Sequence, residues 1–303
     1  MILPAAVASG GEAPMVEKPI KTSLADQPGW KLAAHEDFSG DIEGWEVISA
    51  DPSKGPRYAQ YEPQNVVFTG DSVDITSYRH CGVEPTIQNR QTAPCPEGVP
   101  TLYTSGRIEQ IDHTIKGDFK VFIKAKMTVD KNELLGTRYE LWANNLTKYP
   151  DTRNLGYCIE GTRPNGEFDP AEIFNTKFAT ANNIAHCEDG KLYDVPRKLR
   201  MPEGWLKKTV RLTATRVNGK MEFEINGEAL PLRSDSDRTV DRLRDFKGVS
   251  WDEFNEVQDL PYGMIFSTAV NTFADSKNFR PVDDDEPYKP HTLSIQDMKL
   301  YTR

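Results

Sequence analysis

Three acidic residues, Glu167, Asp169 and Glu172, stand close together in the segment 165–174, which reads Asn-Gly-Glu-Phe-Asp-Pro-Ala-Glu-Ile-Phe. On a regular β-strand Glu167 and Asp169 share a face, and Glu172 points to the other side because side chains alternate. A β-bulge between Asp169 and Glu172 returns Glu172 to the common face, and Pro170 is tolerated there because a ladder hydrogen bond is already missing. The segment therefore predicts one strand with three carboxylates on the same face.

A row of carboxylates on one strand is suited to acid–base and nucleophilic chemistry. Like charges at close range repel, so at least one of the three groups must take up a proton at a higher pH than usual. Glycoside hydrolysis needs one ionised and one protonated carboxyl group, and the retaining reaction needs them about 5 to 5.5 Å apart. Two acids on either side of a bulge can satisfy that spacing, and the third acid would orient the nucleophile. With 46 acids in 303 residues the bare pattern also arises by chance, so its surroundings decide.

The surrounding sequence is a succession of short alternating segments separated by turn signals. In segment 117–129 apolar residues alternate with lysines, which predicts a strand with one buried and one solvated face. Asn218-Gly219 is the strongest short-range signal for a hairpin. Other strands are expected at 66–68, 73–75, 210–215, 221–225, 261–270 and 293–301. Many short strands predict an all-β protein, with a β-sandwich as the first choice and a barrel as the alternative.

The chain length allows one large domain with a short extension. Residues 1–27 include a stretch rich in Gly, Pro, Glu and Lys without periodicity, so we expect a flexible N-terminal tail. Residues 28–303 are expected to form a single β-sandwich catalytic domain. Helical spacing occurs only near 234–258, and it predicts a partly helical insertion between two strands.

The charge balance argues against several kinds of partner. The chain has 37 Lys and Arg against 46 Asp and Glu, a formal net charge of −9. Binding nucleic acid through its phosphates needs a basic face, and attachment to an anionic membrane surface needs clustered Lys or Arg; the sequence shows neither. The longest apolar stretch is far below the roughly 18 residues of a membrane span. We therefore expect no nucleic-acid or membrane partner. We also expect the protein to be a monomer.

The four cysteines help to decide between a secreted and a cytosolic protein. Cys81, Cys95, Cys158 and Cys187 form no C-x-x-C pair and have no zinc-ligand spacing with the five histidines. Two disulfides, Cys81 with Cys95 and Cys158 with Cys187, are our choice among three connectivities; four buried thiols in a cytosolic protein are the alternative. The sequon Asn145-Leu146-Thr147 agrees with secretion. The sequence therefore favours a secreted, extracellular protein.

The acidic segment resembles the bulged E-x-D-x-x-E signature of glycoside hydrolase family 16, the laminarinase, agarase and carrageenase group. Flanking segments resemble the family's other motifs in the same order along the chain, which argues against a chance match. They are Glu36-Asp37-Phe38 (family D-E-F), 103–108 (Y-T-S-G-R-I), 117–125 (Y-G-x-F-E-x-R-I-K), Leu141-Trp142 (a tryptophan before the signature), Ala185-His186-Cys187 (a histidine on the next strand), 205–230 (W-H-x-Y and a hairpin), 261–271 and 294–301.

The resemblance implies a curved jelly-roll sandwich with a substrate cleft across its concave sheet. It implies that Glu167 is the nucleophile, Glu172 the general acid and base, and Asp169 the assisting acid. Polysaccharide or oligosaccharide substrate would be the partner, and no cofactor is expected for catalysis.

The resemblance also singles out candidate substrate-binding residues. Trp142 is expected to be either a sugar platform or a core residue, and His186 either a cleft residue or an ordinary satisfied histidine. Arg107 could bond sugar hydroxyls or a sulfate, or it could pair with an acid on a neighbouring strand, which we favour.

A structural calcium ion is a further expectation from the resemblance. Asp37, the Gly70 carbonyl and Asp297 match positions where family members hold calcium on the convex side. Oxygen ligands of this kind suit calcium.

Together these features predict a retaining endo-glycosidase that hydrolyses a β-linked polysaccharide. We favour a β-1,3-glucan of the laminarin type over a galactan such as agar or carrageenan, because segment 268–271 is nearer to the glucanase pattern. A non-catalytic carbohydrate-binding protein of the same fold is the alternative, but such relatives commonly lose an acid and all three are present. Departures from the family pattern bear on subsites and substrate: Pro170 for a β-branched residue, Arg163-Pro164-Asn165 for the upstream Trp-Pro, and Asn271-Thr272 for Gly-Gly.

Overall fold

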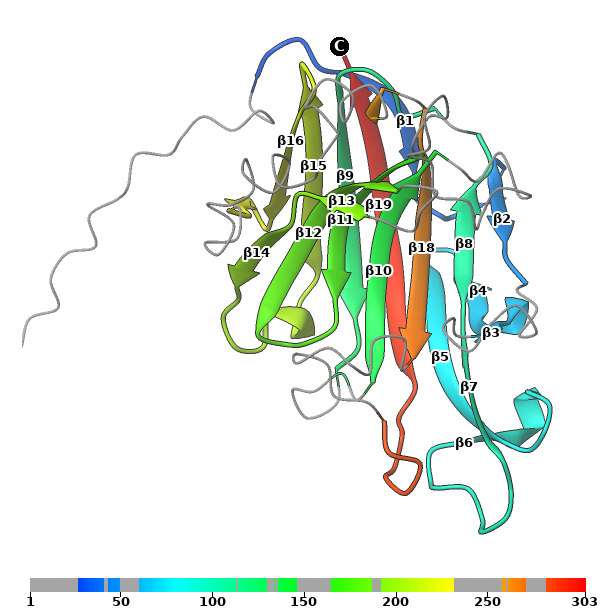
Figure 1. Ribbon diagram of the computed structural model, residues 1–303. Coiled ribbons are helices and arrows are strands. Elements are labelled where there is room, and N and C mark those ends of the chain that lie inside the picture. Colours follow the sequence, from blue (N-terminus) through cyan, green and yellow to red (C-terminus); the bar gives the residue numbers. More distant parts are fainter. Residues whose placement is uncertain are drawn as a thin grey trace, which may run out of the picture.

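The chain folds into two β-sheets that pack face to face, as the computed structural model shows (Figure 1). The structure describes residues 27–40, 43–49, 60–112, 114–129, 134, 136–145, 165–186, 192–231, 258–259, 261–270 and 282–303. This arrangement confirms the predicted β-sandwich and not the closed barrel. In the described residues, no helix has the length and apolar character needed to cross a membrane.

The larger sheet has eleven strands. Its main path runs, in spatial order, through β17 (Glu228–Ala229), β16 (Lys220–Ile225), β15 (Val210–Val217), β9 (Phe119–Met127), β19 (His291–Thr302), β5 (Val73–Cys81), β7 (Thr101–Ser105) and β3 (Gln60–Tyr61). Off this path, β1 (Lys31–Glu36) pairs with β19, and β4 (Val66–Phe68) and β6 (Arg90–Gln91) pair with β5.

The smaller sheet has eight strands and holds the predicted site. It runs through β13 (Leu192–Asp194), β12 (Phe178–His186), β11 (Asn165–Ile173), β10 (Thr137–Asn144), β18 (Gly263–Val270), β8 (Arg107–Gln110) and β2 (Trp45–Val47), and β14 (Arg197–Arg200) pairs with β12. Three 3-10 turns, η3 (Pro63–Asn65), η4 (Ile87–Asn89) and η6 (Trp205–Lys207), complete the named elements.

Several strands predicted from local patterns are confirmed. In β9 Phe119, Val121 and Ile123 are buried, and the lysines lie on the opposite, more exposed face. Asn218 and Gly219, with φ of 48° and 75°, form the tight turn between β15 and β16. Both residues adopt the positive φ that this hairpin turn requires. The strand expected at 73–75 continues to Cys81, because Ser77 and Arg79 are buried despite being polar.

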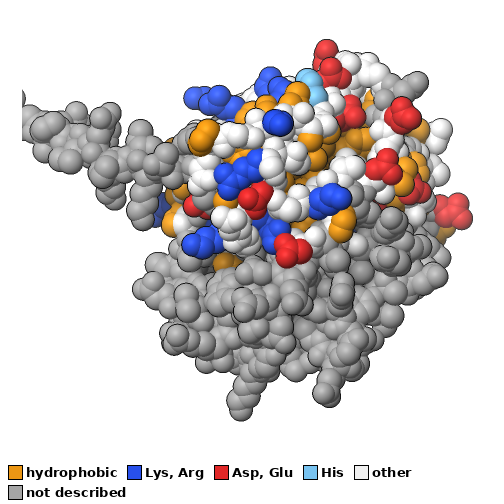
Figure 2. Space-filling model, turned by 90° about the horizontal axis from the view of Figure 1, so that it is seen from above, with side chains coloured by type: hydrophobic (Ala, Val, Ile, Leu, Met, Phe, Trp, Pro, Cys, Tyr) orange, Lys and Arg blue, Asp and Glu red, His pale blue; other side chains and the backbone are white. Residues whose placement is uncertain are grey.

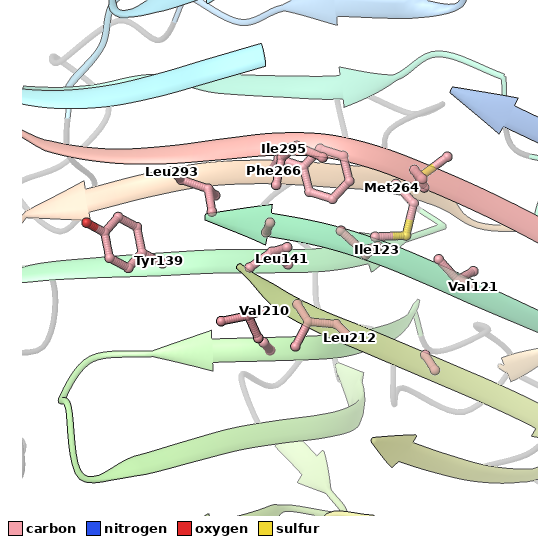
Figure 3. Packing of buried hydrophobic residues seen from close by; sticks show 14 of the residues in the cluster. Val121, Ile123, Tyr139, Leu141, Val210, Leu212, Met264, Phe266, Leu293 and Ile295 are labelled. Carbon is pink, nitrogen blue, oxygen red and sulfur yellow. The ribbon is translucent and has the colours of Figure 1, made fainter. Parts of the chain in front are cut away.

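The core fills the space between the two sheets. Figure 3 shows side chains from both layers meeting there, with Val121, Ile123, Val210, Leu212, Leu293 and Ile295 from the larger sheet and Tyr139, Leu141, Met264 and Phe266 from the smaller one. All are almost completely buried. Burying a large aliphatic or aromatic side chain contributes roughly 1.5 to 3 kcal/mol, so this layer holds the sheets together.

One glycine carries the chain from one sheet to the other. β7 belongs to the larger sheet and β8 to the smaller, with Gly106 as the single residue between them. The two strands follow one another along one edge of the molecule (Figure 1). A Cβ atom at Gly106 would lie 2.8 Å from the Ile75 side chain and 3.0 Å from the Asn65 carbonyl oxygen. Only glycine fits this crossing without displacing its neighbours.

The cysteine prediction is confirmed where the structure describes it. Cys81 and Cys95 form a disulfide that closes the segment between β5 and β7. Cys158 and Cys187 lie outside the described residues, as do residues 1–26 of the predicted tail and nearly all of the 234–258 insertion.

At the end of the molecule seen in Figure 2, side chains of both charge signs are exposed among hydrophobic ones.

Candidate active site

The three predicted acids lie on β11, the strand in which the chain has one extra residue. Between the pairs Leu141–Ala171 and Ala143–Phe168, β10 advances by two residues while β11 advances by three. Opposite β12, the register also shifts between Asp169 and Glu172. An extra residue against both neighbours is a β-bulge, so the predicted bulge is confirmed.

The bulge places the acids on the face of the smaller sheet that points away from the core, called here the outer face. Phe168, Ala171 and Ile173 are fully buried in the core between the sheets. Glu167, Asp169 and Glu172 alternate with them and therefore take the outer face. We call these three residues the acid row.

The surroundings of Asp169 favour its protonated form. Its side chain is almost fully buried, at 1% exposure. Burial raises its pKa well above the usual 3.8; the charges of Glu167 and Glu172 and a hydrogen bond with Glu167 raise it further, while Arg138 opposes them. A protonated Asp169 can donate that hydrogen bond to the Glu167 carboxylate, which also accepts from Asn144 Nδ2 at 3.4 Å. Glu167 is thereby held in place from two sides.

Glu172 has the electrostatic surroundings of a group that must both give and take a proton. Burial raises its pKa above 4.5, Arg138 lowers it, and the charges of Glu167, Glu140 and Asp194 raise it. Arg138 Nη2 donates to Glu172 Oε1 at 2.6 Å. The net effect is a raised pKa, which is what a general acid near neutral pH requires.

The neighbouring strand β10 adds a second set of polar side chains to the outer face. Tyr139, Leu141 and Ala143 face the core, so Arg138, Glu140, Trp142 and Asn144 face outward. Arg138 Nη2 lies 2.6 Å from Glu140 Oε1. The other oxygen of Glu140 accepts a hydrogen bond of 2.5 Å from Ser267 Oγ on β18.

Two of the predicted binding residues also lie together on the outer face. The Arg107 guanidinium carbon is 4.8 Å from the Trp142 ring centroid and 5.4 Å from that of Tyr61. Arg107 is ion-paired with Glu109, which lies on the same strand β8 and not on a neighbouring one. Trp142 Nε1 donates to Ser267 Oγ at 3.4 Å, so Trp142 is an outer-face residue and not part of the core.

No protein-family model and no curated protein sequence matches the chain. Solved structures share its fold. One is the catalytic domain of an endo-1,3-beta-glucanase (laminarinase) from Thermotoga petrophila, with 17% identity, a TM-score of 0.60, and coverage of 90% of this chain and 98% of that one. Another is an endo-beta-1,3-glucanase from Pyrococcus furiosus, with 17% identity, a TM-score of 0.60, and coverage of 90% and 94%.

A third similar structure carries a family name. It is a non-specific endo-beta-1,3(4)-glucanase from family GH16, a mutant crystallised with a glucan oligosaccharide, at 14% identity and TM-score 0.61, with 91% of this chain and 96% of that chain covered. The chain has the fold of the family 16 glycoside hydrolases. At these identities the family 16 likeness concerns the fold, and the chemistry of this chain has to be argued from its own residues.

Within this family 16 fold, His186 is the last residue of β12 and pairs in register with Asn165, two residues before Glu167. Its side chain lies outside the described part of the structure. The role assigned to His186 therefore stays a prediction.

Several residues at this site were not foreseen from the sequence. Arg138, Glu140, Asn144 and Ser267 lie on the outer face, and Tyr61, on β3 of the larger sheet, lies beside Arg107. The alternation in Thr-Arg-Tyr-Glu-Leu-Trp-Ala-Asn at 137–144 predicts a strand with Arg138, Glu140 and Trp142 on one face, but it does not show that this face meets the acid row.

The residues predicted to hold calcium are engaged in other contacts. Asp297 Oδ1 lies 2.6 Å from His35 Nε2, and its Oδ2 accepts from Lys299 Nζ at 3.0 Å. Asp37 accepts from the backbone and hydroxyl of Ser39. Within the described ranges no group of three or more His, Cys, Asp or Glu side chains could hold a metal ion. To bind a cation, Asp297 would first have to release its two nitrogen partners, and the calcium ion stays a prediction.

Proposed function

We propose that the protein is a retaining endo-glycosidase that hydrolyses a β-linked polysaccharide, a β-1,3-glucan of the laminarin type. The observation that carries the proposal is the acid row, in which one bulge brings three carboxyl groups to the outer face and Asp169 and Glu172 have raised pKa values. Glycoside hydrolysis needs a pair of carboxyl groups, one of which keeps a proton.

In the first step, a Glu167 carboxylate oxygen attacks the anomeric carbon of the glycan. The bond from that carbon to the leaving sugar oxygen breaks, and Glu172 gives its proton to that oxygen. Asp169, which is hydrogen-bonded to Glu167, holds the nucleophile in position. In the second step Glu172 takes a proton from water, the resulting oxygen nucleophile attacks the same carbon, and the ester bond to Glu167 breaks. Two displacements at one carbon retain its configuration.

The charges of the outer face support a neutral substrate. A sulfated galactan would need a cation that is not already neutralised. Arg107 is paired with Glu109, and Arg138 contacts both Glu140 and Glu172. The similar structures from Thermotoga petrophila and Pyrococcus furiosus are endo-1,3-β-glucanases, which also favours a glucan.

Secretion is part of the proposal. The Cys81–Cys95 disulfide supports it, because disulfides persist in oxidising extracellular environments. A polymeric glycan too large to enter a cell would be hydrolysed outside it.

The test is release of reducing sugars from laminarin, mixed-linkage β-glucan, agarose and carrageenan. We expect release from laminarin, and we expect Glu167→Gln to lower it by more than about 10³-fold, since removing a nucleophile costs rates of that order. Glu228→Gln, an exposed glutamate on β17 of the other sheet, is the matched control and should leave the rate unchanged. Proton NMR of the first product formed should show the β-anomer.

Three outcomes would contradict this proposal. Release from agarose or carrageenan alone would replace the glucan by a galactan. Binding of a glycan without release of sugar would indicate a carbohydrate-binding protein. A covalent glycosyl adduct trapped on a residue other than Glu167 would overturn the assignment of roles.

A further inference from the structure

One guanidinium nitrogen on the outer face is shared by two carboxylates. Arg138 Nη2 lies 2.6 Å from Glu140 Oε1 and 2.6 Å from Glu172 Oε1. Glu140 and Glu172 are directly opposite each other in the pairing of β10 with β11, and Arg138 is two residues from Glu140 on the same face. The side chains of Arg138, Glu140 and Glu172 are only 13%, 11% and 21% exposed, so water screens their interactions poorly.

Glu140 is fixed in this position from its other side. Its second oxygen accepts from Ser267 Oγ, a fully buried hydroxyl, and the same hydroxyl accepts from Trp142 Nε1. Glu140 therefore cannot turn away from Arg138 without losing a buried hydrogen bond, which is unfavourable because the Ser267 hydroxyl would be left without its acceptor. A simple structural ion pair needs one carboxylate, whereas here a second, anchored carboxylate competes with Glu172 for the same cation.

We propose that Arg138 is a positioning residue for Glu172 and that Glu140 takes up part of the Arg138 charge. Together Arg138 and Glu140 set whether the Glu172 carboxyl carries a proton. This inference rests on the proposed function of Glu172 as the general acid and base. Neither Arg138 nor Glu140 is asked to touch the reacting atoms; both act through Glu172.

The shared cation suits both steps of the reaction. Before the first step Glu140 takes part of the Arg138 charge, so Glu172 can keep the proton that the leaving oxygen needs. After the proton has been given away and the charge on Glu167 has been consumed in the ester bond, Arg138 stabilises the Glu172 carboxylate that accepts a proton from water. The directions of the pKa effects agree, because Arg138 lowers the pKa of Glu172 and Glu140 raises it.

Other charged groups also face Glu172, and they stay constant in the test. Glu167 and Asp169 lie on the same strand, and Asp194 at the end of β13 raises the Glu172 pKa. From β12, the residue opposite Glu172 is the uncharged Thr180. Variants that change only Arg138 or Glu140 therefore isolate the contribution of the pair.

The experiment compares two substitutions that are expected to move the same titration in opposite directions. The basic limb of kcat/KM against pH reports the general acid in the free enzyme. Arg138→Gln removes the cation that favours the ionised form, so the limb should move to higher pH by about one unit or more. Glu140→Gln keeps an oxygen for Arg138 and turns its NH2 group toward Ser267, but it removes the competing charge, so the limb should move to lower pH.

A control pair of residues is available on the same face. Glu109→Gln neutralises another carboxylate paired with an arginine, but Glu109 faces Arg107 and not Glu172. It should leave the basic limb in place, whatever it does to KM. If Arg138→Gln fails to fold, Arg138→Lys, which keeps one charge, should restore a limb close to that of the unchanged protein, and the direction of the Glu140→Gln shift still decides.

A second readout is independent of hydrolysis. Carboxyl-¹³C NMR of glutamate-labelled protein, assigned with Glu172→Gln, follows the titration of Glu172 directly; the midpoints belong to the coupled acid row, so their direction of movement is compared. Opposite movements in Arg138→Gln and Glu140→Gln support the inference even if no glycan is cleaved, in which case only the proposed function fails. Movements in the same direction, no movement, or an equal movement in Glu109→Gln would overturn it, even in an active glycosidase.

Discussion

Two arginines with little exposure to water, Arg79 and Arg138, have opposite kinds of surroundings. Arg79 on β5 is fully buried and donates to the Tyr103 hydroxyl and to the carbonyl oxygens of Asp283 and Glu286. The carboxylate bonded into that network, Asp284, is reached through the Tyr103 hydroxyl. Arg138 on β10 instead contacts two carboxylates directly.

The difference shows how a buried cation can serve the fold or the chemistry. Neutral oxygens satisfy the donors of Arg79 at fixed positions, and they tie segment 283–286 to the sheet whatever the pH. A carboxyl group gains and loses a proton, so the contact of Arg138 with Glu172 changes when Glu172 changes charge. Burial raises the pKa of Tyr103, so its hydroxyl stays neutral in this network.

The largest expected effect separates the two arginines by stability. Arg79→Met should lower the free energy of unfolding by about 3 kcal/mol, because several buried acceptors lose a charged donor at once. Urea unfolding measures it, with Arg303→Met, a partly exposed partner of Asp118, as the control expected to cost less than about 1 kcal/mol. A shift of the basic limb of kcat/KM in Arg79→Met would erase the contrast with Arg138.

A smaller effect of opposite sign is expected in the acid row. The pKa of Asp169 is raised on folding, so its contribution to stability is present below the unfolded value near 3.8 and is lost as the pH rises through the folded value. Asp169→Asn should therefore stabilise the protein at neutral pH, by about 1.4 kcal/mol for each unit of the raise, while lowering activity.

Thermal unfolding of the Asp169→Asn variant from pH 3 to 8 measures this gain. The advantage should vanish at the acid end, where Asp169 is neutral in both folded and unfolded chains. A variant less stable than the unchanged protein at pH 7 would show that Asp169, like Arg79, serves the fold.

The smallest effect tests the anchor of Glu140. Ser267→Ala removes the hydroxyl that joins Trp142 to Glu140, and we expect a loss of about 1 kcal/mol in urea unfolding. Thr268→Ala on the same strand, whose hydroxyl accepts from the Gly106 amide at 3.4 Å, is the matched control for the pH profile. A basic limb that moves with Thr268→Ala as much as with Ser267→Ala would place the effect in the strand and not in Glu140.

The acid row could be predicted because its information is local. The alternation of Glu167 and Asp169, the offset of Glu172 and the presence of Pro170 together specify a bulged strand within a few residues. The hairpin at Asn218-Gly219 is local in the same sense, since the turn residues determine the pairing.

The pair Arg138 and Glu140 could not be predicted as a site, because its meaning depends on distant strands. Alternating polar residues at 137–144 are also typical of an ordinary solvated strand face. Only the pairing of β10 with β11 and β18 shows that this face meets Glu172 on one side and Ser267 on the other. Similarly, the strand at 73–81 is longer than expected because Arg79 is a core-facing arginine whose acceptors lie about 200 positions away in sequence.

The crossing at Gly106 has a mechanical consequence for the outer face. A single residue joins Ser105 in one sheet to Arg107 in the other. Because Gly106 has no side chain, the backbone passes close to its neighbours at this edge. With only this one residue between the strands, the two sheets cannot slide past each other here without distorting the backbone. Arg107 directly follows this crossing, so its backbone has little freedom to move relative to the larger sheet while its guanidinium lies over the Trp142 ring.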